Sequence, residues 1–560
     1  MRRLGLALLG LFSPQDGGHG PRYVDVAAAV GPFAPNVCGE ARKDWILEVN
    51  GSGAAWLDAD GDGDLDLWLA NGSTLAALRA GAPGAGNRLY RNDEGRLTDV
   101  TQAAGVAGSR FGCGVAIADV EGDGDLDVLV TEIGPNRLFR NRGDGTFEEV
   151  GERAGLADDS WSTSAVFFDA DGDGDADLYV ANYLAFDLAS PKGPGGSCVW
   201  KGIPVMCGPE GLPPEADRFY RNEGGRFVEA TAEAGLVPRA PGYGLGAVAF
   251  DADGDGALDL YVANDSTPNF LFVNRGDGRF AEKGFLSGAA LSRDGKEQAG
   301  MGVAAGDADG DGREDLLVTN FSGEPNAFYR NLGRGLFADD AFPSGLGGPS
   351  VPLLGWGTAL LDLDLDGDLD AFVANGHVYP QADGAGTDTS YAQRALVFEN
   401  VGRGKFRDRT GAWGDAIPVP RVRRAASFGD FDDDGSLEIL VGVLGAEPEL
   451  LDAQGLSGGS LVVRLVGTRS RRDGEGALVR IETGGTTQAR RSRRAYSFQS
   501  SNDPRVHFGL GAASAADVVE VLWPSGLLER REDVPAGARL LAREGSGLVL
   551  EGEPPRARDE

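Results

Sequence analysis

Residues 58–66 read DADGDGDLD, and this pattern of aspartates and glycines returns six more times along the chain. The further copies are DVEGDGDLD from Asp119, DADGDGDAD from Asp169, DADGDGALD from Asp251, DADGDGRED from Asp307, DLDLDGDLD from Asp362 and DFDDDGSLE from Asp430. We call them acidic loops 1 to 7, in chain order. Each places acids at positions 1, 3, 5 and 9, and oxygen ligands are what Ca²⁺ prefers. The pattern therefore predicts up to seven Ca²⁺ ions, one in each repeat.

The predicted metal ligands are the acids at these four positions. In loops 1 to 3 they are Asp58, Asp60, Asp62, Asp66, Asp119, Glu121, Asp123, Asp127, Asp169, Asp171, Asp173 and Asp177. In loops 4 to 7 they are Asp251, Asp253, Asp255, Asp259, Asp307, Asp309, Asp311, Asp315, Asp362, Asp364, Asp366, Asp370, Asp430, Asp432, Asp434 and Glu438. Four carboxylates in one loop repel one another, so a bound cation explains the pattern better than turn geometry alone. Loop 7 departs most, because Glu438 closes it and Asp433 replaces a glycine.

The acidic loops lie between segments in which apolar residues recur at every second position. GCGVAIAD precedes loop 2 at residues 112–119, and LDVLVTE follows at 126–132. A period of two indicates β-strands, so each loop is predicted at the tip of a β-hairpin. An EF-hand would require flanking helices and a glutamate at position 12, where loop 1 has Leu69. The EF-hand interpretation is therefore rejected.

The spacing of the loops predicts a propeller. They begin 50 to 82 residues apart, enough for a four-stranded blade with variable connections. A second hairpin motif, such as NRLYRNDEGRL from Asn87, follows each of the first six loops. The segment YVDVAAAVG at 23–31 matches only the last strand of a repeat. Because a ring of sheets must leave no bare edge, we expect residues 23–27 to complete the seventh blade.

The remaining chain divides around this propeller, which is predicted over residues 21–460 with an insertion at 184–216. Residues 461–545 contain further alternating segments and glycine turns, which indicate a small β-sandwich. Residues 546–560 are expected to be a disordered tail. The start, MRRLGLALLGLF, has the charge and short apolar run of a secretory signal peptide, predicted over residues 1–20. No other segment approaches the length of a transmembrane helix.

Two sets of motifs resemble known families. The repeated G-x-G-V-A and D-x-D-x-D-G-x-x-D strings resemble the FG-GAP (VCBS) repeats of integrin α-subunit propellers, and this resemblance implies seven blades that hold calcium. GTRSRRDGEGALVRIETGG from Gly467 and VVEVLWPSGLLERREDVPAG from Val518 look like the ASPIC/UnbV domain. Together with NGHVYP at 375–380, the layout is similar to the cartilage acidic protein family. Arg471 departs from that family's pattern, where an asparagine is usual.

Charge and cysteines limit the possible partners and compartment. The formal net charge is -34, and seven Ca²⁺ ions would bring it to about -20. Such a chain repels nucleic acid. Cys198 and Cys207 are expected to form a local disulfide, with Cys38 and Cys113 as a second candidate pair. A secreted, periplasmic or cell-surface monomer is therefore predicted.

The C-terminal region differs in charge from the propeller. Residues 461–560 hold 16 arginines and 14 acids, a balance of +2, so the remainder carries -36. Arg490, Arg491, Arg493 and Arg494 form the densest basic cluster. They could bind an acidic glycan or a lipid headgroup, but an exposed, solvated strand is the interpretation that we favour here.

The sequence contains no catalytic motif that we recognise. A G-x-S-x-G elbow, an HExxH pair and a Walker loop are all absent, so no catalytic residue and no cofactor other than Ca²⁺ is predicted. The leading hypothesis is a secreted, calcium-binding interaction module for a protein or glycan. One alternative is a hydrolase or isomerase with its site on the propeller axis near the insertion. Another is a structural component of a matrix or cell envelope.

Overall fold

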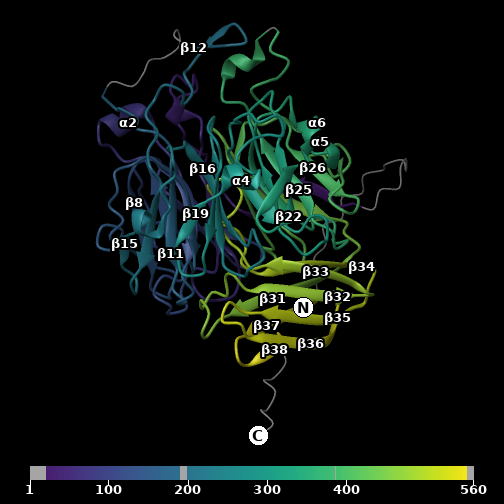
Figure 1. Cartoon of the computed structure of the whole chain (residues 1–560). Helices are drawn as coiled ribbons and strands as arrows, with labels where there is room; N and C mark the ends of the chain where they lie inside the picture. The colour runs from purple at the N-terminus through teal and green to yellow at the C-terminus, as the bar shows by residue number, and fades with distance from the viewer. Residues whose placement is uncertain (1–19, 190–197, 385, 552–560) are drawn as a thin grey trace.

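A computed structural model describes residues 20–189, 198–384 and 386–551. Within these residues, seven four-stranded antiparallel sheets follow one another along the chain, and we call them blades 1 to 7. The first strand of each blade contacts the first strand of the next, and the first strand of blade 7 contacts that of blade 1. This closed arrangement confirms the predicted all-β propeller (Figure 1). Each acidic loop connects the first and second strands of its blade.

The bounds of the blades are as follows. Blade 1 comprises β2 (Ala54–Leu57), β3 (Asp66–Leu69), β4 (Arg88–Asn92) and β5 (Leu97–Asp99); blade 2 comprises β6 (Gly112–Ala118), β7 (Asp127–Glu132), β8 (Gly134–Asn141) and β9 (Phe147–Glu149). Blade 3 comprises β10 (Ser162–Phe168), β11 (Asp177–Asn182), β14 (Arg218–Asn222) and β15 (Phe227–Glu229); blade 4 comprises β16 (Gly244–Phe250), β17 (Asp259–Asn264), β18 (Phe270–Asn274) and β19 (Phe280–Glu282). Blade 5 comprises β20 (Val303–Gly306), β21 (Asp315–Val318), β22 (Ala327–Gly333) and β23 (Leu336–Asp339); blade 6 comprises β24 (Gly355–Leu361), β25 (Asp370–Asn375), β26 (Leu396–Asn400) and β27 (Phe406–Asp408).

Blade 7 joins the two ends of the propeller chain. It comprises β28 (Arg423–Gly429), β29 (Glu438–Val443), β30 (Glu449–Gln454) and, as its outer strand, β1 (Arg22–Asp25). Strand β1 pairs antiparallel with β30, with Tyr23 opposite Ala453. The predicted closure of the ring by the N-terminal segment is thus confirmed. The Tyr23 ring is fully buried, so burial of apolar surface adds to the backbone pairing.

Replacing Tyr23 by alanine tests how much this closure contributes. We expect Tyr23→Ala to lower the free energy of unfolding by about 3 kcal/mol, because a large buried side chain is lost from the last strand of the ring. Urea unfolding followed by circular dichroism measures the loss. Arg22→Ala, which removes an exposed side chain of the same strand, serves as the control. Equal midpoints for the two variants would contradict a role for β1 in holding the ring closed.

The helices are short and lie between strands. They are α1 (Ala27–Val30), α2 (Leu75–Arg79), α3 (Thr231–Ala234), α4 (Gly284–Ser287), α5 (Ala341–Ser344) and α6 (Gly347–Ser350), with the 3₁₀ turns η1 (Ile46–Glu48) and η2 (Pro380–Asp383). No helix among the described residues is long and apolar enough to cross a membrane. The predicted signal peptide falls almost wholly on residues 1–19, which lie outside the described part of the chain.

The C-terminal domain is a β-sandwich at one end of the propeller (Figure 1). One sheet has the order β34 (Val506–Gly511), β31 (Gly459–Val466), β37 (Ala538–Arg543) and β38 (Gly547–Leu550); the other has the order β33 (Thr486–Arg491), β32 (Leu478–Thr483), β35 (Ala515–Leu522) and β36 (Leu528–Pro535). The two sheets enclose one apolar core. Residues 546–560 were predicted to be a disordered tail. This prediction was wrong for residues 547–550, which form β38; that strand pairs with β37 and buries Leu548.

The insertion carries a hairpin at the opposite end of the propeller (Figure 1). Strands β12 (Cys198–Trp200) and β13 (Ile203–Val205) pair antiparallel. The predicted Cys198–Cys207 disulfide is present, with Cα atoms 5.2 Å apart. The second candidate pair was wrong: Cys38 and Cys113 are free and buried in a common apolar cluster, where thiols pack as small apolar side chains.

Candidate calcium loops and their cover

The acid at position 1 shapes each acidic loop by accepting backbone hydrogen bonds. Asp58 accepts from the N–H groups of Gly61 (2.8 Å) and Gly63 (3.1 Å). Position 4 needs left-handed backbone, which Gly61 adopts with a φ of 77°. Leu365 and Asp433 adopt the same conformation in loops 6 and 7, with φ of 63° and 62°. The residues that replace glycine at position 4 in loops 6 and 7 thus preserve the shape of the loop.

The acid at position 9 ties each loop to the strands around it. Asp66 accepts from the N–H of Ala59 (2.9 Å) and from that of Asn92 (2.7 Å) on β4. The side chain of Asn92 donates to the carbonyls of Leu65 and, across to blade 7, Phe431. Equivalent asparagines link successive blades at Asn141, Asn222, Asn274, Asn331 and Asn400. Sequence reasoning missed this contact, although the recurring asparagine of the second hairpin motif was a usable signal.

The structure brings carboxylates of one loop together, as a metal site requires. Oxygens of three acids lie within 4.8 Å of one another in several loops. The groups are Asp58, Asp60 and Asp62; Asp169, Asp171 and Asp173; Asp251, Asp253 and Asp255; Asp307, Asp309 and Asp311; and Asp362, Asp364 and Asp370. Positions 1, 3 and 5 therefore form the usual group, and position 9 takes part in loop 6.

The electrostatics of the loops favour a cation. Burial, followed by neighbouring carboxylates and opposed by backbone hydrogen bonds, raises the pKa of Asp259 and Asp315 to about 8 and that of Asp66 to about 7. Several buried carboxylate oxygens also have no hydrogen-bond donor, although such atoms are costly to leave unpaired. They are the Oδ1 atoms of Asp60, Asp171, Asp309, Asp362 and Asp430. These oxygens suit Ca²⁺, which binds carboxylates directly.

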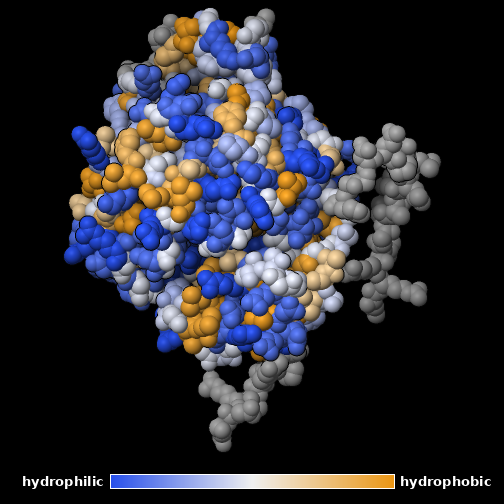
Figure 2. Space-filling view, turned by 45° about the vertical axis from the view of Figure 1, so that its right-hand side comes forward, coloured by the Kyte–Doolittle hydropathy of each residue, from blue (hydrophilic) through white to orange (hydrophobic). Residues whose placement is uncertain are grey.

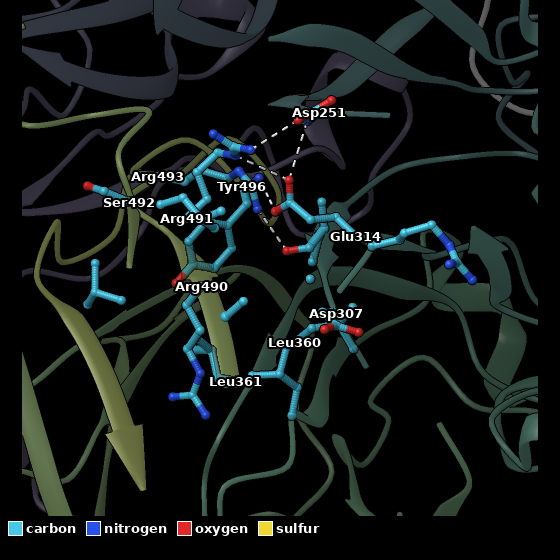
Figure 3. A pocket seen from close by; sticks show the side chains of 18 of the residues that line it. Asp251, Asp307, Glu314, Leu360, Leu361, Arg490, Arg491, Ser492, Arg493 and Tyr496 are labelled. Atoms are coloured by element: carbon cyan, nitrogen blue, oxygen red, sulfur yellow. Dashed lines mark hydrogen bonds and ion pairs between the residues drawn. The ribbon is translucent and has the colours of Figure 1, made fainter. Parts of the chain in front are cut away.

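The C-terminal domain covers the end of the propeller that carries the loops. Arg490 pairs with Asp362 at 2.9 Å and Arg491 with Asp251 at 3.3 Å. Arg493 pairs with Glu314 at 2.5 Å. Figure 3 shows Arg491 and Arg493 converging on Asp251 and Glu314 at the edge of a cavity of about 220 Å³, while Arg490 extends away from this group. The favoured interpretation of this cluster as an exposed, solvated strand was therefore wrong. Arg490, Arg491 and Arg493 neutralise acids of the propeller, of which Asp362 is buried, and Arg494 lies buried near Asp473 of its own domain.

Residues 493–503, which we call the axial segment, fill the propeller axis. Backbone pairs join Ser497 to Val303, and the carbonyl of Gln499 accepts from Val115 at 3.0 Å. Other residues of the segment form hydrogen bonds with the first strands of the remaining blades. The partners on those strands are Ala54, Ser164, Ala249, Thr358 and Phe428. The first strand of every blade therefore contacts this one segment. Phe498 is fully buried and packs edge-on against Trp356, 4.9 Å between ring centres.

Comparisons with known proteins agree with the motifs. The FG-GAP-like repeat family matches residues 58–130, 119–180, 251–318 and 307–373, and the family described as ASPIC and UnbV matches residues 467–549. Human cartilage acidic protein 1 is 29% identical over 311 residues, which are 54% of this chain and 44% of that protein. The mouse protein is 28% identical, over 54% of this chain and 45% of its own length. The chain thus spans less than half the length of these relatives.

Solved structures with a similar fold share little sequence with the chain. The BP39L lectin from Burkholderia pseudomallei covers 73% of this chain and 98% of its own, with 12% identity and a TM-score of 0.41. YCF48 bound to D1 peptide covers 79% and 97%, with 9% identity and a TM-score of 0.40. With its sheets, loops and motifs in agreement, the chain is a protein of FG-GAP-like repeats followed by an ASPIC and UnbV domain.

Proposed function

We propose that the protein is a secreted, calcium-stabilised propeller that binds an extracellular protein or glycan. The buried, unpaired carboxylate oxygens of the acidic loops support calcium most directly. The residues that would hold the ion are the acids at positions 1, 3, 5 and 9, and the ion would neutralise part of their charge. Binding to the folded loops alone would then add to the stability of the fold. The Cys198–Cys207 disulfide supports an oxidising compartment.

The end of the propeller opposite the C-terminal domain is the proposed binding surface, which we call the free end. The other end is covered by the C-terminal domain, and the axis is filled by the axial segment. Partly buried aromatic side chains at the free end include Trp45, Phe186, Trp200 and Phe321. Hydrophobic residues are visible at the upper end of the molecule in Figure 2, where Figure 1 places β12. Aromatic rings with one wet face are favoured in recognition sites for proteins and sugars.

Trp200 is the centre of this surface. Its ring lies 4.7 Å from that of His377 and 5.6 Å from that of Tyr379. Lys201 lies over the indole at 5.1 Å, so a cation sits beside the aromatic group. Burial lowers the pKa of His377 to about 3, aided by Arg424, so this imidazole is neutral at physiological pH. The filled axis and the absence of a catalytic motif support a binding role over an enzymatic one.

A binding screen with matched variants tests the proposal. Glycan-array and pull-down measurements on the full chain, with calcium and with EGTA, identify the partner. We expect Trp200→Ala to weaken binding at least about tenfold, because aromatic anchors dominate such contacts. Val199→Ala, on the same hairpin and 64% exposed, is expected to retain binding. Unchanged binding by Trp200→Ala would contradict the free end as the site.

A further inference from the structure

Arginines of the propeller pair with the acidic loops of three blades. In blades 2, 3 and 5 the arginine just before the recurring asparagine forms an ion pair with the acid at position 3. The pairs are Arg140 with Glu121, Arg221 with Asp171, and Arg330 with Asp309. Each of these loops therefore contains a fixed positive charge supplied by the third strand of its own blade.

Blades 4, 6 and 7 lack that arginine and receive one from the C-terminal domain. The equivalent residues are Val273, Glu399 and Asp452. In these three blades the acid at position 1 is paired instead: Asp251 with Arg491, Asp362 with Arg490, and Asp430 with Arg539 at 3.5 Å. Arginines of the propeller thus pair with three loops and arginines of the C-terminal domain pair with three others. In total, six of the seven loops have an acid paired with a guanidinium group.

Loop 1 is the exception. Arg91 occupies the same position in β4, but it turns away and pairs with Asp93 at 3.0 Å. Among the described residues, no ion pair reaches the predicted ligands of loop 1. Arg464, Arg505 and Arg539 line a cavity of about 250 Å³ beside it, yet each pairs with other acids.

Loop 5 is the opposite case. Besides the pair between Arg330 and Asp309, Arg313 at position 7 pairs with Asp311. Two of its predicted ligands are therefore neutralised by guanidinium groups. Position 7 carries an aspartate in loop 1, Asp64, and an alanine in loop 4, Ala257. The charge around the predicted ligands is thus least negative in loop 5 and least compensated in loop 1.

We infer that these arginines grade the calcium affinity of the loops, with loop 1 the tightest site and loop 5 the weakest. The inference rests on the proposed binding of calcium. Calcium affinity in oxygen-ligand loops depends on the charge of the ligands, and a cation beside a carboxylate weakens its attraction for a second cation. The unpaired Oδ1 atoms of Asp171 and Asp309 still allow calcium to bind beside the arginines. The arginines therefore set how tightly it binds.

Exchanging the residues at position 7 tests the inference on the full chain. Isothermal calorimetry with calcium chloride is applied to Arg313→Ala and to Asp64→Arg. We expect the weakest class of sites to tighten at least about tenfold in the first variant and the tightest class to weaken at least about tenfold in the second. Arg42→Gln, which removes an exposed arginine that pairs with Asp44 outside the acidic loops, is the control and should leave the isotherm unchanged.

The outcomes separate the inference from the proposed function. Melting curves in EGTA first establish that the three variants fold like the parent protein. Calcium uptake with isotherms identical to that of the parent protein for Arg313→Ala and Asp64→Arg would overturn the grading by arginines while leaving calcium binding in place. No calcium uptake by any form of the protein would overturn the proposed function itself.

Discussion

Excess EGTA is expected to lower the melting temperature of the protein by roughly 10–20 °C. A ligand present at a hundred times its Kd adds about 2.7 kcal/mol per site, and up to seven sites act together on one chain. Dividing by an unfolding entropy of about 2.1 cal/mol/K per residue gives this shift. The loops unfold more readily without the ion because their buried carboxylates then repel one another. Differential scanning calorimetry measures the effect.

Magnesium provides the control for this experiment. Mg²⁺ demands a small octahedral site and keeps its water, so adding it in excess of EGTA should restore little of the lost stability, whereas calcium should restore all of it. A melting temperature that is the same with EGTA and with calcium would contradict a stabilising role for the metal.

Phe498→Ala is expected to lower the free energy of unfolding by about 3–5 kcal/mol, the usual cost of removing a fully buried aromatic side chain. The loss of stability should affect the propeller and the C-terminal domain together, because the axial segment belongs to the C-terminal domain and fills the axis of the propeller. Urea unfolding followed by fluorescence and by circular dichroism measures it.

An exposed residue of the C-terminal domain supplies the comparison. Leu528 on β36 is 54% exposed, so Leu528→Ala should change the unfolding free energy by less than about 0.5 kcal/mol. If Phe498→Ala and Leu528→Ala unfold at the same urea concentration, the axial segment does not hold the domains together.

The propeller could be predicted because each repeat encodes its own hairpin. The strands around loop 1 could be predicted from their alternating apolar residues. The role of the strand at Tyr23 could be predicted because a ring of sheets must pair its last edge. The disulfide of the insertion was predictable for the same reason, since Cys198 and Cys207 are close in sequence. The pairing of Cys38 with Cys113 was predicted only because the number of cysteines is even. Both side chains are instead buried as free thiols in an apolar cluster.

The cover over the loops could not be predicted from local pattern. The axial segment, RAYSFQSSND in its last ten residues, has no apolar period, because its polar groups bond to strands from the whole ring. Arg491 and Asp251 are 240 residues apart and meet only in the fold. A signal was nevertheless present: a domain with a charge of +2 and a dense arginine cluster follows a region with a charge of -36.

The axial segment follows all seven blades along the chain, and this order determines when the fold can be completed during synthesis. Strand β1 is made first but must wait for β30, and the residues that fill the axis are made later still. Before β30 is made, the nascent chain is an open arc of sheets with bare edges, a form prone to aggregation. A chain truncated just before residue 493 is therefore expected to close its ring through β1 and β30 but to lack the segment that fills the axis.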